Sequence, residues 1–174
     1  MLVYFAAPLF SEAEKTFNER LTTKLEDEGF SVFLPQRDGV EKDKPPYEAM
    51  PPDDRRRAMF ELDRAKILEA DVFLFVLDGR APDEGACVEL GIAHAHNHLQ
   101  NARKLLVGLH TDTRAAFPSS KLNPMIRVPL DHIAEDVDGL IAALRTVKDD
   151  PSSANPSAAI PRTQRKEKKL KADS

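Results

Sequence analysis

Residues 71–93, with the sequence DVFLFVLDGRAPDEGACVELGIA, decide the fold. The run from Asp71 to Leu77 is apolar on both faces, which is typical of a central parallel strand that is covered on both sides. After a turn that contains Asp78 and Gly79, a helical pattern runs from about Glu84 to Asn97. Ligands of open α/β sheets bind at the carboxyl ends of the strands. The turn after Leu77 is therefore the first place to look for a functional site.

The same alternation of strand and helix extends in both directions from this segment. Further strands are predicted at residues 2–6, 31–34 and 104–108 and near 126–128, and further helices at residues 11–28, 55–70 and 136–146. Ser11 and Glu14 form a capping box for the first helix, and Gly29 ends it. The proline-rich residues 35–54 and residues 110–125 are expected to be irregular. The pattern predicts a doubly wound parallel sheet with right-handed crossovers.

The composition is that of one globular domain of ordinary character, with 174 residues, 41% hydrophobic and 31% charged residues. A net charge of −4 gives no electrostatic reason to expect binding to a nucleic-acid polymer. No apolar run reaches membrane-spanning length, and the apolar start of the chain is too short for a signal peptide. We expect a cytoplasmic protein that binds no membrane. Residues 149–174 have the composition of a flexible basic tail.

Three carboxylates are placed where chemistry could occur. Asp63 lies on a line of apolar residues with Met59 and Ile67, Asp83 lies in the turn after the central strand, and Glu89 lies near the start of the next helix. A helix N-terminus lowers the pKa of a carboxyl group, so Glu89 is expected to be ionised and usable as a nucleophile. In the other interpretation Asp83 caps the helix, Glu89 is a surface residue, and the nearby Gly85 and Gly91 serve packing.

Four separate motifs resemble the nucleoside 2-deoxyribosyltransferase family. They are Tyr4-Phe5-Ala6-Ala7-Pro8-Leu9-Phe10, the helix of Asp63, Pro82-Asp83-x-Gly85-x-x-x-Glu89-x-Gly91-x-Ala93, and Asn123-Pro124-Met125. The resemblance covers most of residues 1–147, in the expected order. It implies a flavodoxin-like sheet of about five parallel strands with helices on both faces, a catalytic domain over residues 1–148, and a role in nucleotide salvage.

The resemblance also implies roles for individual residues in cleaving the N-glycosidic bond of 2′-deoxynucleosides and passing the sugar to a free nucleobase. Glu89 would attack the anomeric carbon and form a covalent deoxyribosyl-enzyme. Tyr4 would orient the Glu89 carboxylate, and Asp63 would protonate the leaving base. Two carboxyl groups in different environments suit such a reaction, and two displacements at one carbon retain its configuration.

Further residues would bind the substrate. Asp83 would hold the 5′-hydroxyl of the sugar, Gly85 would allow close approach, and Phe10 would pack against the base. Asn123 and Met125 would reach the sugar from a neighbouring subunit, so a homo-oligomer is implied. No cofactor and no metal are expected. The chain continues to Ser174, whereas many family members end in an aromatic residue whose carboxylate helps to hold the base, so the preferred base stays open.

Two alternatives remain open at this stage. The related 2′-deoxynucleoside 5′-monophosphate N-hydrolases tend to carry serine where Asp83 stands, and an anionic Asp83 would repel a phosphate, although Arg80 and Arg114 could offset this repulsion. A non-catalytic nucleotide-binding module on the same fold is the other alternative.

Two other features could carry chemistry but are weaker. His94 and His98 share a helix face but lack a third zinc ligand at a suggestive spacing. Cys87 lies near a helix start, between residues that suit ordinary packing.

Overall fold

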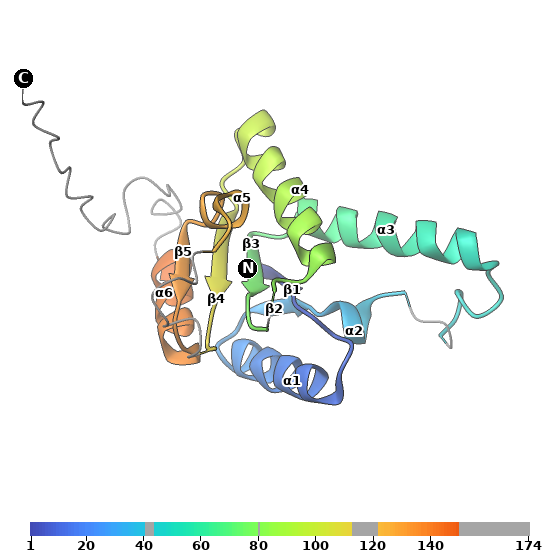
Figure 1. The fold of residues 1–174 in the computed structure, drawn as a ribbon, viewed down its shortest axis with the longest axis horizontal. Helices are drawn as coiled ribbons and strands as arrows, with labels where there is room; N and C mark the ends of the chain where they lie inside the picture. The colour runs from blue at the N-terminus through green and yellow to red at the C-terminus, as the bar shows by residue number, and fades with distance from the viewer. Residues whose placement is uncertain (41–43, 80, 113–121, 150–174) are drawn as a thin grey trace, which may run out of the picture.

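The computed structural model describes residues 1–40, 44–79, 81–112 and 122–149, and these form a five-stranded sheet with the order β2-β1-β3-β4-β5 (Figure 1). All neighbouring strands are parallel. The strands are β1 (Leu2–Ala6), β2 (Ser31–Phe33), β3 (Val72–Val76), β4 (Leu105–Leu109) and β5 (His132–Ala134). This strand order is the flavodoxin-like one. The predicted α/β fold is confirmed.

Helices cover both faces of the sheet. The four long helices are α1 (Glu12–Asp27), α3 (Pro52–Glu69), α4 (Glu84–Gln100) and α6 (Val137–Asp149). Buried side chains of α1 and α6 share one core with Val72, Leu74 and Val76 of the central strand. Those of α3 and α4 share a second core with Phe73 and Phe75. Every residue of β3 is buried, as the apolar run predicted.

Local signals place the ends of α1 as expected. The Ser11 hydroxyl accepts a hydrogen bond from the backbone N–H of Glu14, and the Glu14 carboxylate accepts one from the N–H of Ser11. These two bonds satisfy donors that the helix itself leaves unpaired. Gly29 follows the helix with φ of +77°, a conformation that glycine adopts without steric cost.

The expectation of an irregular segment at residues 35–54 is wrong at both ends. A short helix, α2 (Pro35–Asp38), begins it, and α3 begins at Pro52 rather than near Arg55. Proline at a first helical position has a helical φ and no N–H to satisfy, so these prolines start helices. Asp53 and Asp54 lie in the first turn of α3 and do not cap it. Figure 1 shows α3 extending well beyond the sheet.

The strand expected near residues 126–128 is also wrong. The Asn123 carboxamide accepts a hydrogen bond from the N–H of Met125 and starts the short helix α5 (Pro124–Arg127). The last strand comes later, after Asp131, whose carboxylate accepts a hydrogen bond from the N–H of Leu106. A proline at the first helical position outweighs the β-branched residues that suggested a strand.

Two of the predicted segments lie partly or wholly outside the residues that the structure describes. The predicted tail lies outside the described residues from position 150 onward, as do residues 113–121 of the second expected loop. None of the helices in the described part of the chain combines the length and apolar character that crossing a bilayer would require.

Candidate active site

The turn between β3 and α4 holds Asp83 at the N-cap of α4. Oδ1 of Asp83 accepts a hydrogen bond of 2.8 Å from the N–H of Ala86. A Cβ atom at Gly85 would lie 3.1 Å from this same oxygen, so glycine leaves room for the cap. The capping role expected in the structural interpretation is therefore present. A carboxylate has two oxygens, and the cap occupies one, so the other can accept a hydrogen bond from a ligand.

Glu89 lies on α4, six residues after Asp83, and a hydrogen bond joins it to the first strand. The Tyr4 hydroxyl donates a hydrogen bond of 2.8 Å to Oε1 of Glu89. Tyr4 is completely buried and Glu89 is half-buried. The surface position for Glu89 in the structural interpretation is therefore wrong. The carboxylate is held at one oxygen by a donor from a different element of the sheet.

The expectation that the helix N-terminus lowers the pKa of Glu89 is wrong. The pKa of Glu89 is raised to about 7: burial raises it most, the hydrogen bond from Tyr4 lowers it, and the charges of Asp63 and Asp83 also raise it. Removal from water disfavours the charged form, and this effect outweighs the partial positive charge of the helix end. Glu89 is therefore a carboxyl group that titrates near neutral pH.

Asp63 belongs to α3, which packs beside α4 on the same face of the sheet. Burial raises the pKa of Asp63 to about 6. Burial also raises the pKa of Tyr4, as do the charges of Glu89 and Asp63. Tyr4 therefore stays protonated and acts as a hydrogen-bond donor. The structure brings Tyr4, Asp63, Asp83 and Glu89 into one electrostatically coupled group.

Three predicted substrate-binding residues are not part of this group in the single chain. Phe10 is 77% exposed and Met125 is 80% exposed, and Asn123 is exposed as well. In the described part of the chain, no hydrogen bond joins their side chains to those of Tyr4, Asp63 or Glu89. Gly91, which also belongs to the motif, has open space where a Cβ would stand, so crowding within the chain does not explain its presence.

One residue at this edge of the sheet carries no role in the sequence interpretation. The Asp78 carboxylate accepts hydrogen bonds from the backbone N–H groups of Thr111 and Asp112, at 2.6 and 3.0 Å, and from the Thr111 hydroxyl at 2.5 Å. It ties the turn that carries Asp83 to the segment after β4. The position of Asp78 just after a strand indicates a possible structural role for its carboxylate. The sequence alone does not show that its hydrogen-bond partners lie more than thirty positions further along the chain.

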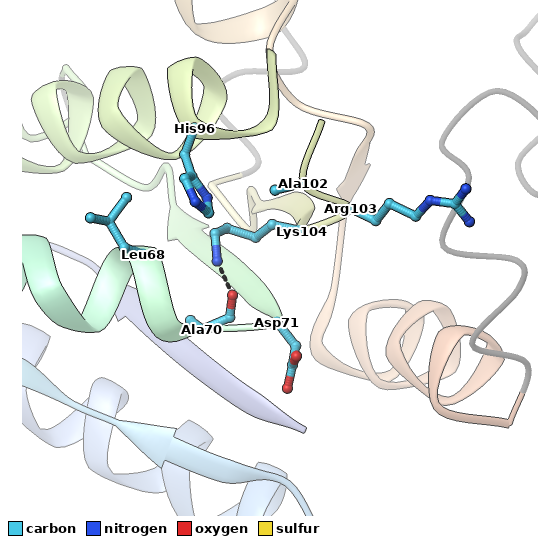
Figure 2. Close-up of a pocket in the computed structure, with 7 residues that line it drawn as sticks. All are labelled: Leu68, Ala70, Asp71, His96, Ala102, Arg103 and Lys104. Atoms are coloured by element: carbon cyan, nitrogen blue, oxygen red, sulfur yellow. Dashed lines mark hydrogen bonds between the residues drawn. The ribbon is translucent and has the colours of Figure 1, made fainter. Parts of the chain in front are cut away.

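A cavity of about 260 Å³ lies at the amino ends of β3 and β4, at the opposite end of these strands from the candidate site (Figure 2). Lys104 lies in it, 5% exposed, and its Nζ donates a hydrogen bond to the carbonyl of Ala70 at the end of α3. Asn97 bonds both backbone groups of Lys104. Nδ1 of His96 also lies buried here, without a hydrogen-bond partner among the described residues. Lys104 therefore closes the last turn of α3, a structural role.

Cys87 and the histidines of α4 lie outside the group of Tyr4, Asp63, Asp83 and Glu89. Burial and the charges of Asp83 and Glu84 raise the pKa of the Cys87 thiol, which reduces its reactive thiolate form. Within residues 1–40, 44–79, 81–112 and 122–149, no three His, Cys, Asp or Glu side chains are grouped as a metal site would require.

Comparisons with solved structures agree with the fold. The chain has the fold of three solved structures. A conserved protein from Enterococcus faecalis V583 has TM-score 0.64 and 23% identity, over 83% of this chain and 97% of that one. A 2-deoxyribosyltransferase from the psychrotolerant Bacillus psychrosaccharolyticus has TM-score 0.64 and 20% identity, over 81% and 90%. A 2-desoxiribosyltransferase from Leishmania mexicana has TM-score 0.55 and 18% identity, over 86% and 97%.

The sequence comparisons decide the family. No curated protein sequence matches the chain significantly. The sequence model described as nucleoside 2-deoxyribosyltransferase matches residues 3–150, which include the four coupled residues of the site. This chain belongs to the nucleoside 2-deoxyribosyltransferase family.

Proposed function

We propose that this protein transfers the 2-deoxyribosyl group of 2′-deoxynucleosides between nucleobases through a covalent intermediate on Glu89. The observation that carries the proposal is the hydrogen bond from Tyr4 to Glu89 beside the carboxyl group of Asp63. It gives one carboxylate a fixed orientation and leaves a second, coupled carboxyl group with a raised pKa. Such a pair suits a nucleophile and a proton donor.

In the first step the free oxygen of the Glu89 carboxylate attacks the anomeric carbon, and the bond from that carbon to the base nitrogen breaks. Asp63 donates its proton to the departing base, which leaves neutral. The transition state resembles an oxocarbenium ion, which forms more easily in a sugar without a 2′-hydroxyl. The product is a deoxyribosyl ester of Glu89.

In the second step the nitrogen of an incoming base attacks the same carbon, and the Glu89 carboxylate leaves. Asp63, now ionised, takes the proton that the incoming base loses. Water in place of the base gives free deoxyribose and hence a side hydrolase activity. The hydrogen bond from Tyr4 stabilises the carboxylate each time it carries charge. The configuration at the anomeric carbon is retained.

The deciding experiment is incubation of the protein with 2′-deoxyinosine and adenine, followed by chromatography of the products. We expect new 2′-deoxyadenosine and free hypoxanthine. Hypoxanthine and deoxyribose without 2′-deoxyadenosine would identify a hydrolase instead. Inosine serves as the control, because its 2′-hydroxyl disfavours the oxocarbenium-like state.

The N-hydrolase alternative depends on the substrate's 5′ group. Asp83 at the start of α4 would oppose a 5′-phosphate by a few kcal/mol, at an effective dielectric constant of about 20. Arg80 and Arg114, which could offset this repulsion, lie outside the described residues. Asp83→Ser keeps a good N-cap and removes the charge. Cleavage of 2′-deoxyinosine 5′-monophosphate by this variant and not by the natural sequence would support the nucleoside assignment.

The non-catalytic alternative predicts binding without turnover. Equilibrium dialysis with 2′-deoxyinosine would show it as saturable binding with no hypoxanthine released. The presence of Tyr4, Asp63 and Glu89 in one coupled group favours catalysis over this alternative.

We also propose that the active protein is a homo-oligomer in which Asn123 and Met125 complete a neighbour's site. The exposure of both residues supports this part of the proposal. Its substrates would be 2′-deoxynucleosides and free nucleobases, with no cofactor, in the cytoplasm.

A further inference from the structure

Three aromatic rings lie side by side on the adjacent strands β2, β1 and β3. Tyr4 of β1 is the register partner of Phe33 on β2 and of Phe73 on β3. The Tyr4 ring centroid lies 5.7 Å from each of the other two centroids, and the ring planes are inclined by only 18° to Phe33 and 10° to Phe73. Tyr4 is therefore enclosed in an aromatic stack on both sides.

Register partners on parallel strands project to the same face, about 4.8 Å apart, which is close to the distance that offset-stacked rings require. Tyr4 and Phe73 are completely buried, and Phe33 is 6% exposed. A ring held between two others cannot tilt without displacing one of them. The direction of the Tyr4 hydroxyl is therefore fixed by the stack.

The hydroxyl at the end of this fixed ring is the one that donates to Oε1 of Glu89. The Glu89 side chain has three rotatable bonds, and α4 alone does not select one of its conformers. Nearby residues Ala86, Leu90 and Ala93 pack α4 onto the same core as Tyr4 and Phe73, so the helix backbone is fixed relative to the stack.

We propose that Phe33 and Phe73 are positioning residues for the transfer reaction, because their stack on Tyr4 holds the hydroxyl that orients the Glu89 carboxylate. This inference rests on the proposed function for its kinetic consequence. The geometric part, in which the stack maintains the bond from Tyr4 to Glu89, stands independently of any reaction.

The stack also has a consequence for the titration of Glu89. The groups that act on this carboxyl are Tyr4 from β1, Asp63 from α3 and Asp83 at the start of α4. Both carboxylates raise the Glu89 pKa, and the bond from Tyr4 lowers it. If the Tyr4 ring becomes free to tilt, the lowering influence weakens while the raising influences remain. The pKa of Glu89 then rises.

The test compares Phe73→Leu with the matched variant Phe75→Leu. Both remove a completely buried phenyl ring from β3 in the same core, but Phe75 meets Phe73 edge-on, at 79° and 6.5 Å, and does not stack on Tyr4. Comparable falls in melting temperature are expected. In Phe73→Leu we expect kcat to fall roughly tenfold with KM little changed, and the basic limb of the pH–rate profile to move up by about half a unit, because the Glu89 pKa is the higher of the two. In Phe75→Leu both quantities should stay close to those of the natural sequence.

The Glu89 pKa is also measured without turnover, by NMR titration of protein labelled with carbon-13 at glutamate, with Glu89→Gln identifying the resonance. A higher Glu89 pKa in Phe73→Leu than in Phe75→Leu supports the geometric inference even if the natural sequence transfers no deoxyribose, which would refute only the proposed function. Equal Glu89 pKa values in the two variants would overturn the inference. If Phe73→Leu does not fold, Phe33→Leu, at the more exposed end of the stack, gives the same comparison.

Discussion

The Tyr4 hydroxyl donates a 2.8 Å hydrogen bond to Oε1 of Glu89, across 85 positions of the chain. Tyr4 is fixed within the sheet, and Glu89 lies on the helix that follows the central strand. The bond lowers the pKa of a carboxyl group whose net pKa is still raised to about 7, mainly by burial. It therefore acts on both the orientation and the charge of the proposed nucleophile.

Tyr4→Phe should keep the aromatic stack and remove only this hydrogen bond. The pKa of Glu89 should rise. Because this pKa already lies above that of Asp63, the basic limb of kcat/KM should move up by about one unit and the fraction of enzyme in the active form should fall. At pH 6 we expect kcat/KM to fall by roughly 10- to 100-fold, which corresponds to the loss of one hydrogen bond to a charged group. Rates measured from pH 5 to 8 test this. A basic limb in its original place would contradict the role given to Tyr4.

The pH dependence of transfer should be a narrow bell. The reaction needs Glu89 ionised and Asp63 protonated, and their pKa values are about 7 and about 6. The rate should fall on both sides of a maximum between these two pKa values. The form with Glu89 ionised and Asp63 protonated is the minor singly protonated form, so the acidic limb follows the lower pKa and the basic limb the higher one. Asp63→Asn should remove the basic limb and lower kcat by about 10²- to 10⁴-fold. A basic limb that persists in this variant would exclude Asp63 as the acid.

Glu89→Gln should abolish transfer and stabilise the protein at high pH. The pKa of Glu89 rises from 4.5 to about 7 on folding, so the folded state binds more protons in this window and the free energy of unfolding falls as pH rises through it. Removing the charge should recover on the order of 2 kcal/mol at pH 8 and nothing at pH 4. Urea denaturation at both pH values tests this. An equal change at both would show that the burial of charge at Glu89 costs nothing.

Lys104 should make the free energy of unfolding rise with pH in the alkaline range, whereas Glu89 makes it fall with pH near neutrality. Burial lowers its pKa from 10.5 to about 8, while the charge of Asp71 acts against this shift. The unfolded state binds more protons between these values, so stability should rise as pH increases from 8 to 10.5. Lys104→Met should lose this rise, which we expect to be about 1 kcal/mol because the adjoining cavity has room for water. If the free energy of unfolding changed equally with pH in Lys104→Met and in the natural sequence, the lowered pKa of Lys104 would be refuted.

The proposed sharing of residues between subunits predicts complementation. Glu89→Gln and Asn123→Ala should each be inactive alone. If Asn123 acts in a neighbour's site, a mixed oligomer contains some sites with both natural residues. For randomly mixed dimers about one quarter of all sites are complete, so about a quarter of the natural activity should return after co-refolding. No recovery in oligomers shown by mass spectrometry to be mixed would place Asn123 in its own subunit's site.

The sequence by itself determined the architecture and the candidate residues. The buried run of β3 and the capping box of α1 act over a few positions, and a pattern read along the chain captures such local causes. The motif around Glu89 indicated the family, which the match over residues 3–150 confirms. The sequence patterns gave wrong predictions at two prolines, because proline can either interrupt regular structure or start a helix. Pro52 and Pro124 start helices.

Only the tertiary structure decided the pKa of Glu89 and the packing and hydrogen bonds that hold the residues of the candidate site in place. The helix position of Glu89 predicted a lowered pKa, and burial raised it. The stack of Phe33, Tyr4 and Phe73 depends on strand register, and the bonds of Asp78 to Thr111 and Asp112 depend on the pairing of β3 with β4. Desolvation and register are set by segments distant in sequence, and no local pattern records which of them will meet.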